Sequence, residues 1–279
     1  MILLAFKLAS EDIAARHDQS PVLHMKTQTM SDTPAPHKPV PDADVLRRLL
    51  MLFVAFCAVC LLAGASRMSP PAWQLAPAFG PLRIREALSM FVFAPAVTAL
   101  AWFMVRALAR GRPHCGVEAL MVLAVCFIAC GMGIHDPANL LGSHASRETP
   151  VGDALHFLDD GLSHWVFWCG FVLGSWVFGI QQLLSPLREK MGRVWRCGFG
   201  AVTAALLWVM LTNLWDEYPK TRADLCVIAA AAAVPLAFHL AARRDVALAR
   251  LPVLCVIYPA YLGSIVGTLI CWLARYGKI

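Results

Sequence analysis

The chain alternates long apolar runs with short polar connections, and the runs have the length of membrane-spanning helices. An α-helix needs about 20 apolar residues to cross the hydrocarbon core of a bilayer. The runs predict helices over residues 46–66, 86–108, 115–135, 154–182, 194–215, 222–242 and 251–275. Ten-residue segments of alternating polarity, which are typical of a membrane β-barrel, are not seen in the sequence. The pattern predicts an all-α, polytopic integral membrane protein with a seven-transmembrane-helix bundle.

Residues 1–45 lack this pattern. Met1–Ser10 is apolar but short, and no small-residue cleavage site follows it, so it does not read as a signal peptide. Residues 30–41 are polar and rich in proline, with too few apolar side chains to offset the entropy of ordering. We expect 1–45 to be a disordered cytoplasmic tail before a transmembrane domain of residues 46–279. Met30 is a second plausible start, so we expect residues 1–29 to be dispensable.

Composition and charge agree with a membrane protein and orient it. The chain is 59% apolar and 15% charged, whereas soluble domains contain about 25% charged residues. With seven spans, fourteen Lys and Arg flank the side of the N-terminus and eight flank the other side. Cytoplasmic flanks carry the excess of positive charge. We therefore expect a bacterial inner (plasma) membrane protein with a cytoplasmic N-terminus and an outside C-terminus. The net charge of +6 then needs no nucleic-acid partner.

Cysteine and glycine within the spans are interpreted as packing residues. All ten cysteines lie in or beside predicted spans, so we expect no disulfide framework. Free Cys is commonly buried as a small hydrophobe. Gly170 and Gly174 in the fourth span, and Gly263 and Gly267 in the seventh, have the spacing that lets helices approach closely.

Ionisable residues gather where the third predicted span ends and the fourth begins. A charged side chain near hydrocarbon costs about 2.5 kcal/mol or more, so such residues are usually paired or functional. The group consists of His135, Asp136, Asp153, His156, Asp159, Asp160 and His164. It indicates a site at the outer edge of the membrane.

Proline is expected to end the third helix near this group. Pro137 disfavours helical geometry at Asp136. Asp136 is then a suitable N-cap for a short new turn, and the third helix ends at His135.

The fourth helix presents its polar residues on one face. At 100° per residue, an arc of about 100° contains His156, Asp160, Ser163 and His164, with Asp159 at its margin. Consecutive helices are usually antiparallel neighbours, so this face is expected to meet His135 at the same depth.

The spacing of these residues restricts metal binding. His156 and His164 are about 12 Å apart along the helix axis, too far for one ion. The preferred set for one divalent metal is His135, Asp160 and His164. Two nitrogens, one carboxylate and an open position suit zinc first, or iron, and zinc would activate a bound water.

Three further residues are candidates for proton transfer. His156 is expected to support the ligands or to shuttle protons. Asp216 and Glu217, at the outer end of the fifth predicted helix, can act as a general base or as oxygen ligands.

Seven spans with Asp160…Ser163-His164 and further imidazoles resemble the CREST superfamily of membrane metal-dependent hydrolases, such as alkaline ceramidases. The resemblance covers roughly residues 115–182. It implies a zinc ion held by one Asp and three His, which hydrolyses lipid amides. It implies Asp160 and His164 as ligands and Ser163 as a polar neighbour in the catalytic site. The family's late His-xxx-His pair has no counterpart, because the seventh predicted helix contains no His.

The sequence favours a hydrolase of a membrane lipid or lipid-linked substrate with an outward-facing, metal-dependent site. Three alternatives remain open. A proton- or ion-coupled transporter would relay protons through Asp160 and His164, although few ionisable residues lie in the middle of the helices. A haem protein would use His135 and His164 as axial ligands. In a structural protein, acidic residues in the first turns of a helix would only complement its dipole.

Overall fold

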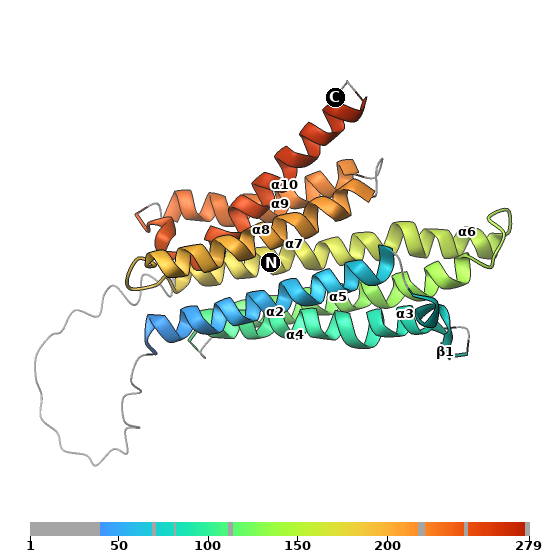
Figure 1. The fold of residues 1–279 in the computed structure, drawn as a ribbon, viewed down its shortest axis with the longest axis horizontal. Coiled ribbons are helices and arrows are strands. Elements are labelled where there is room, and N and C mark those ends of the chain that lie inside the picture. The colour runs from blue at the N-terminus through green and yellow to red at the C-terminus, as the bar shows by residue number, and fades with distance from the viewer. Residues whose placement is uncertain are drawn as a thin grey trace, which may run out of the picture. The chain divides into compact units, whose positions relative to one another are not determined.

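The computed structural model describes residues 40–68, 71–80, 82–110, 114–216, 221–242 and 245–276. The expected disordered tail up to residue 39 lies outside these ranges and stays a prediction. In the described part the chain is helical apart from one short hairpin (Figure 1). The long helices are α2 (Asp42–Met68), α4 (Ala94–Leu108), α5 (Cys115–Gly142), α7 (His164–Leu184), α8 (Arg193–Asp216), α9 (Thr221–Ala242) and α10 (Pro252–Tyr276).

Short elements precede three of the long helices. Between α2 and α4 lie η1 (Ala72–Leu75), β1 (Pro77–Phe79), β2 (Leu82–Arg83), α3 (Ile84–Leu88) and the π-helical η2 (Ser89–Phe93). Strands β1 and β2 are antiparallel. Gly80 has φ +59° in their turn, a conformation that glycine adopts without a Cβ clash. Helix α6 (Pro150–His156) and the π-helical η3 (Phe157–Ser163) run into α7, and η4 (Leu248–Arg250) precedes α10.

Each apolar run of the sequence forms a helix close to its predicted bounds. Within the described ranges, six helices are long and apolar enough to cross a membrane: Asp42–Ser66, Ile84–Leu108, Cys115–Gly142, Pro150–Leu184, Arg193–Leu211 and Pro252–Cys271. The apolar stretch described in α9, Leu225–Ala241, is shorter. This architecture is all-α and compatible with an integral membrane protein.

The predicted end of the third helix is wrong. Helix α5 continues through Pro137 to Gly142, so His135 and Asp136 lie inside it. Proline removes only the N–H that would bond the carbonyl of Gly133. A long helix packed against neighbours tolerates that loss, as membrane helices often do. Asp136 therefore caps no new turn, and it is 7% exposed.

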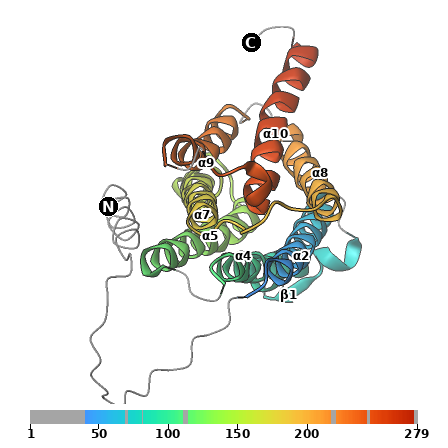
Figure 2. The ribbon, with the colours of Figure 1, turned by 90° about the vertical axis from the view of Figure 1, so that its left-hand side faces the viewer.

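The long helices of the described part pack as a ring. Around it α2 contacts α4, α4 contacts α5, α5 contacts α7, α7 contacts α9, α9 contacts α10, α10 contacts α8, and α8 returns to α2. Figure 2 shows this order end-on. The largest apolar core contains Leu49 and Phe53 of α2, Phe199 of α8 and Val256 of α10. Phe53 and Phe199 meet edge to face, with ring centroids 6.2 Å apart. This core holds α2, α8 and α10 together.

Glycine brings α5 and α7 into backbone contact. A Cβ on Gly131 would lie 2.7 Å from the backbone N of Phe167, and one on Gly170 would lie 2.7 Å from the carbonyl O of Ala124. Both distances are below van der Waals contact. The close approach places the polar residues of the two helices within hydrogen-bonding reach.

Other small residues also serve packing, as predicted. A Cβ on Gly263 would meet Leu207 at 3.1 Å, and one on Gly267 would meet Leu211 at 2.8 Å, so both glycines let α10 approach α8. The ten cysteines all lie in the described ranges and are free in the structure.

Asp42 joins three segments where α2 begins, four residues before the predicted start. Its Oδ1 lies 2.6 Å from Nη2 of Arg110, after the end of α4. Its Oδ2 accepts the backbone N–H groups of Arg188 (2.7 Å) and Glu189 (3.2 Å) between α7 and α8. Arg110 also donates to the carbonyl of Val40 at 2.7 Å. The carboxylate thus ties α2, α4 and the α7–α8 connection together.

We expect Asp42→Asn to lower the free energy of unfolding by about 2 kcal/mol, because hydrogen bonds to a charged group contribute about 1.5–3 kcal/mol. Thermal unfolding in a mild detergent measures the change. Asp44→Asn is the matched control, since among the described residues Asp44 pairs with the exposed Arg47 alone, at 3.1 Å, and such pairs contribute at most about 1 kcal/mol. Equal shifts for the two variants would contradict the role of Asp42.

Candidate functional site

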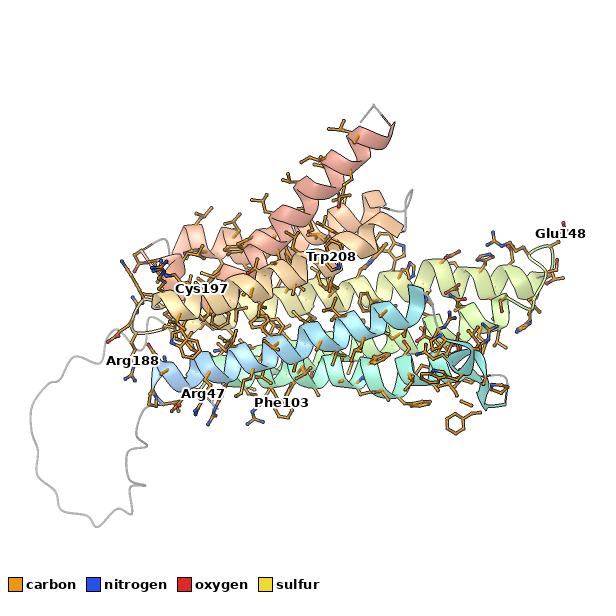
Figure 3. All side chains as sticks on the ribbon, viewed as in Figure 1. Arg47, Phe103, Glu148, Arg188, Cys197 and Trp208 are labelled. Atoms are coloured by element: carbon orange, nitrogen blue, oxygen red, sulfur yellow. The ribbon has the colours of Figure 1, made fainter. Side chains whose placement is uncertain are left out.

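The site lies on a helix pair that is longer than a bilayer is thick. The continuous helix from Pro150 to Leu184 has 35 residues, about 50 Å at 1.5 Å per residue, whereas the hydrocarbon core is about 30 Å thick. Its α6 end reaches past the end of α2 (Figure 1). Arg47 and Arg188 mark one end of the bundle and Glu148 marks the other (Figure 3). In a membrane, part of this pair must therefore project beyond the hydrocarbon.

A π-helix sets the register of the polar residues. In the segment η3, hydrogen bonds close from residue i+5 to residue i, so each residue turns the helix less than in an α-helix. Asp159 and His164 are five residues apart and would lie about 140° apart on an α-helix. The wider turn brings them nearer to one face. The predicted α-helical face, which put Asp159 only at its margin, is thereby corrected.

His135 on α5 and Asp159 on η3 make a close contact across the helix interface. Nδ1 of His135 lies 2.7 Å from Oδ1 of Asp159. Their side chains are 20% and 15% exposed, so both are largely shielded from solvent. The two atoms are close enough for a strong electrostatic contact, but they do not form a hydrogen bond of regular geometry. A carboxylate beside Nδ1 favours a proton on that nitrogen and leaves Nε2 for other contacts.

A second imidazole stands beside this pair. The ring of His164 lies 5.1 Å from the ring of His135, centroid to centroid, at 44°. Trp168 is 5.8 Å from His164 and packs edge to face with Trp165 at 5.2 Å. Trp165 is 59% exposed. Two imidazoles and one carboxylate thus adjoin an aromatic surface.

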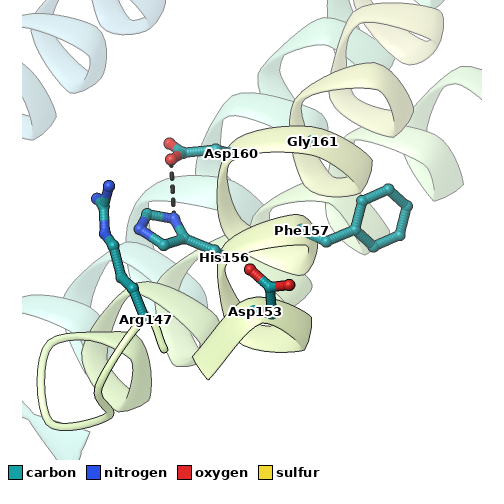
Figure 4. A pocket seen from close by; sticks show the side chains of 6 residues that line it. All are labelled: Arg147, Asp153, His156, Phe157, Asp160 and Gly161. Carbon is teal, nitrogen blue, oxygen red and sulfur yellow. Dashed lines mark ion pairs between the residues drawn. The ribbon is translucent and has the colours of Figure 1, made fainter. Parts of the chain in front are cut away.

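His156 and Asp160 form a separate, more exposed pair. Nδ1 of His156 lies 3.0 Å from Oδ2 of Asp160, with side chains 29% and 43% exposed. They line an open pocket of about 460 Å³ (Figure 4). Its lining residues are Arg147, Asp153, His156, Phe157, Asp160 and Gly161. Asp160 faces this pocket with His156, and Asp159 takes the place beside His135.

The other predicted catalytic residues are placed differently. Ser163 is 1% exposed, and its hydroxyl donates a hydrogen bond to the backbone carbonyl of Asp159 on its own helix. This position does not suit a nucleophile. Asp216 is the last residue of α8, and its side chain, like the whole of Glu217, lies outside the described part. The structure therefore leaves the roles of Asp216 and Glu217 as predictions.

The predicted metal set of His135, Asp160 and His164 is not assembled in the described residues. They contain no group of three or more His, Cys, Asp or Glu that could hold a metal ion. Two imidazoles on one tetrahedral ion would have ring centroids about 5.2 Å apart at Zn–N distances near 2.0–2.1 Å. The observed 5.1 Å fits that value. Axial haem ligands on opposite sides of the iron would need about 6.4 Å, which is more than the observed separation.

Sequence reasoning missed Asp159 as the partner of His135. A single extra residue per turn in η3 decides which carboxylate faces α5, and side-chain spacing alone does not reveal it. The one local signal is Asp159-Asp160-Gly161, three weak helix formers in succession. A regular helix is most easily widened at such a place.

Comparisons with known proteins found no matching family model, curated protein or solved structure. The resemblance to the CREST superfamily therefore stays a prediction, and functional argument rests on the residues described above.

Proposed function

We propose that this chain is an integral membrane hydrolase that acts on a lipid or lipid-linked substrate at the outer membrane boundary. The contact between Nδ1 of His135 and Oδ1 of Asp159, 2.7 Å apart, is the observation that carries the proposal. It lies beside a second imidazole on the helix pair that exceeds the hydrocarbon thickness. In the proposed orientation, a proton-transfer pair near the outer end of this helix pair can reach both water and the linkage region of a lipid.

The proposed chemistry follows from the fixed imidazole. The negative charge of Asp159 beside Nδ1 favours the tautomer of neutral His135 that carries its proton there, so Nε2 can accept a proton from water as a general base. The water oxygen attacks the carbonyl or phosphoryl centre, and the bond to the leaving oxygen or nitrogen breaks. His135 then returns the proton to the leaving group, directly or through His164. Asp159 stabilises the imidazolium form between these steps.

The proposal includes seven spans, with α9 as the sixth, and a cytoplasmic N-terminus. The end marked by Arg47 and Arg188 (Figure 3) is then cytoplasmic, in keeping with the excess of positive charge on cytoplasmic flanks. The His135–Asp159 pair faces outward, where water and the outer lipid leaflet meet.

The proposal is tested by turnover of defined lipids. Purified protein in mixed-lipid vesicles should deplete one lipid class over hours, and mass spectrometry of the extracted lipids should find its two hydrolysis products. His135→Ala protein, reconstituted in equal amount, should leave that class intact. Unchanged lipid composition for the wild type across glycerolipids, sphingolipids and lipid-linked sugars would overturn the proposal.

A divalent metal, zinc first, is kept as a separate prediction. His135 and His164 have a suitable ring separation, but a third protein ligand is not found in the described part. We expect about one equivalent of metal in purified protein, lost in His135→Ala and His164→Ala but retained in His144→Ala. Elemental analysis measures it. Wild-type protein without metal would refute the metal prediction. The acid–base pair would then be tested by lipid turnover alone.

A proton-coupled transporter is the second candidate, favoured by polar groups along α7. Ser175 and Tyr261 share a hydrogen bond of 2.8 Å inside the bundle, and Gln181 and Gln182 are fully buried nearer the other end of α7. This function predicts proton flux into vesicles that carry a pH-sensitive dye. Tyr261→Phe should abolish the flux and leave lipid hydrolysis unchanged. Flux without hydrolysis would replace the first candidate by the second.

A further inference from the structure

The open pocket that His156 and Asp160 line is built from two pieces of chain. Arg147 comes from the connection between α5 and α6, and the other lining residues come from α6 and η3. In Figure 4, Arg147 and Phe157 lie at opposite sides of the group, with His156 and Asp153 between them. The pocket is a shallow, open depression of about 460 Å³, which is large enough for a polar lipid head group.

The lining of the pocket includes one positive group, Arg147, and one negative group, Asp153, that do not pair with each other. His156 and Asp160 satisfy each other at 3.0 Å. Arg147 and Asp153 also line the pocket, and no ion pair within the described ranges joins either of them to a partner. A guanidinium and a carboxylate in one pocket that do not pair with each other suit a ligand that carries both charges.

A phosphate linked to an ammonium group has that charge pattern. The planar guanidinium of Arg147 can donate two parallel hydrogen bonds to phosphate oxygens. The Asp153 carboxylate can pair with the ammonium. The ring of Phe157, 64% exposed, offers a face to the same cation. A purely anionic head group would be repelled by Asp153, and a purely cationic one would be repelled by Arg147.

We infer that the pocket binds the zwitterionic head group of a phospholipid, of the phosphoethanolamine or phosphocholine type. The inference rests on the proposed function and names its substrate class. Asp160 lines the pocket and its sequence neighbour Asp159 contacts His135, so a lipid bound there by its head group would lie on the same stretch of helix as the acid–base pair. The tryptophan surface formed by Trp165 and Trp168 lies along the same helix towards the hydrocarbon.

Binding of soluble head-group fragments tests this inference without turnover. Protein in an uncharged maltoside detergent is titrated calorimetrically with glycerophosphoethanolamine, glycerol 3-phosphate and ethanolamine. The zwitterion should bind at least ten-fold more tightly than either fragment. Arg147→Gln and Asp153→Asn should each weaken its binding about ten-fold. Glu148→Gln is the matched control, because Glu148 is exposed and does not line the pocket.

The two single-charge fragments sharpen the test. Arg147→Gln should abolish binding of glycerol 3-phosphate, whereas Asp153→Asn should leave it equal or stronger. Equal affinities for the zwitterion and glycerol 3-phosphate, or unchanged zwitterion binding in both variants, would overturn the inference. His135→Ala separates the two proposals: it should keep head-group binding while losing hydrolysis. Head-group binding without wild-type hydrolysis refutes only the proposed function, and hydrolysis indifferent to the head group refutes only this inference.

Discussion

Asp159→Asn should reduce the rate of lipid hydrolysis by about 10²–10⁴-fold, the range of a general acid–base contribution. The amide keeps the shape of the side chain but loses the charge that orients His135 and stabilises its protonated form. Initial rates in vesicles of the lipid class that the wild type consumes give the measurement. Thermal unfolding of the same sample checks that the fold is retained.

The neighbouring carboxylate provides the matched control. Asp160→Asn changes the same group one residue away, and Asp160 pairs with the exposed His156. We expect it to retain at least a tenth of the wild-type rate. The opposite ranking, with Asp160→Asn inactive and Asp159→Asn active, would contradict the π-helical register of η3. It would favour the regular α-helical face predicted from the sequence.

Gly131→Ala should destabilise the bundle by about 1–3 kcal/mol, the usual effect of overpacking. The added methyl group would lie 2.7 Å from the backbone N of Phe167, and backbone cannot move aside as a side-chain tip can. Because α5 must shift from α7, His135 also moves from Asp159, so hydrolysis should decline with stability. Thermal unfolding in detergent and initial rates measure the two effects.

Gly133→Ala tests the same substitution two residues along α5. A Cβ on Gly133 meets nothing within 4 Å, and alanine favours a helix over glycine by about 0.8–1.0 kcal/mol. We expect equal or higher stability and unchanged hydrolysis. A similar loss in both variants would mean that glycine itself, and not close packing, matters on this helix.

Most of the helical architecture was predictable because membrane-length apolar runs leave few alternatives. The runs located each long helix, and the glycine spacing predicted close packing of the fourth and seventh. Pro137 misled the prediction of the third helix, because a local propensity was applied where neighbouring helices support the chain. Asp42 was placed in the tail because its partner Arg110 is distant in sequence, and no local pattern predicts their ion pair.

The site was predictable in composition and only partly in arrangement. The free-energy cost of charge near hydrocarbon predicted a site that includes His135 and His164, and their rings do lie close together. The choice between Asp159 and Asp160 depended on the turn of one short π-helix. The presence of Arg147 and Asp153 in one pocket could not be predicted either, since Arg147 lies in a connection between helices and only the folded chain brings it to the pocket.

Hydrolysis in ¹⁸O-labelled water tests the central claim most directly. Wild-type protein in vesicles that contain the consumed lipid should yield one product with an ¹⁸O atom, because the water activated by His135 supplies the attacking oxygen. The position of the label also identifies the broken bond. Asp159→Asn protein should yield label only at the rate of protein-free vesicles. Lipid products without ¹⁸O, or equal labelling by the wild type and Asp159→Asn, would contradict the assignment of a hydrolase site to the His135–Asp159 pair.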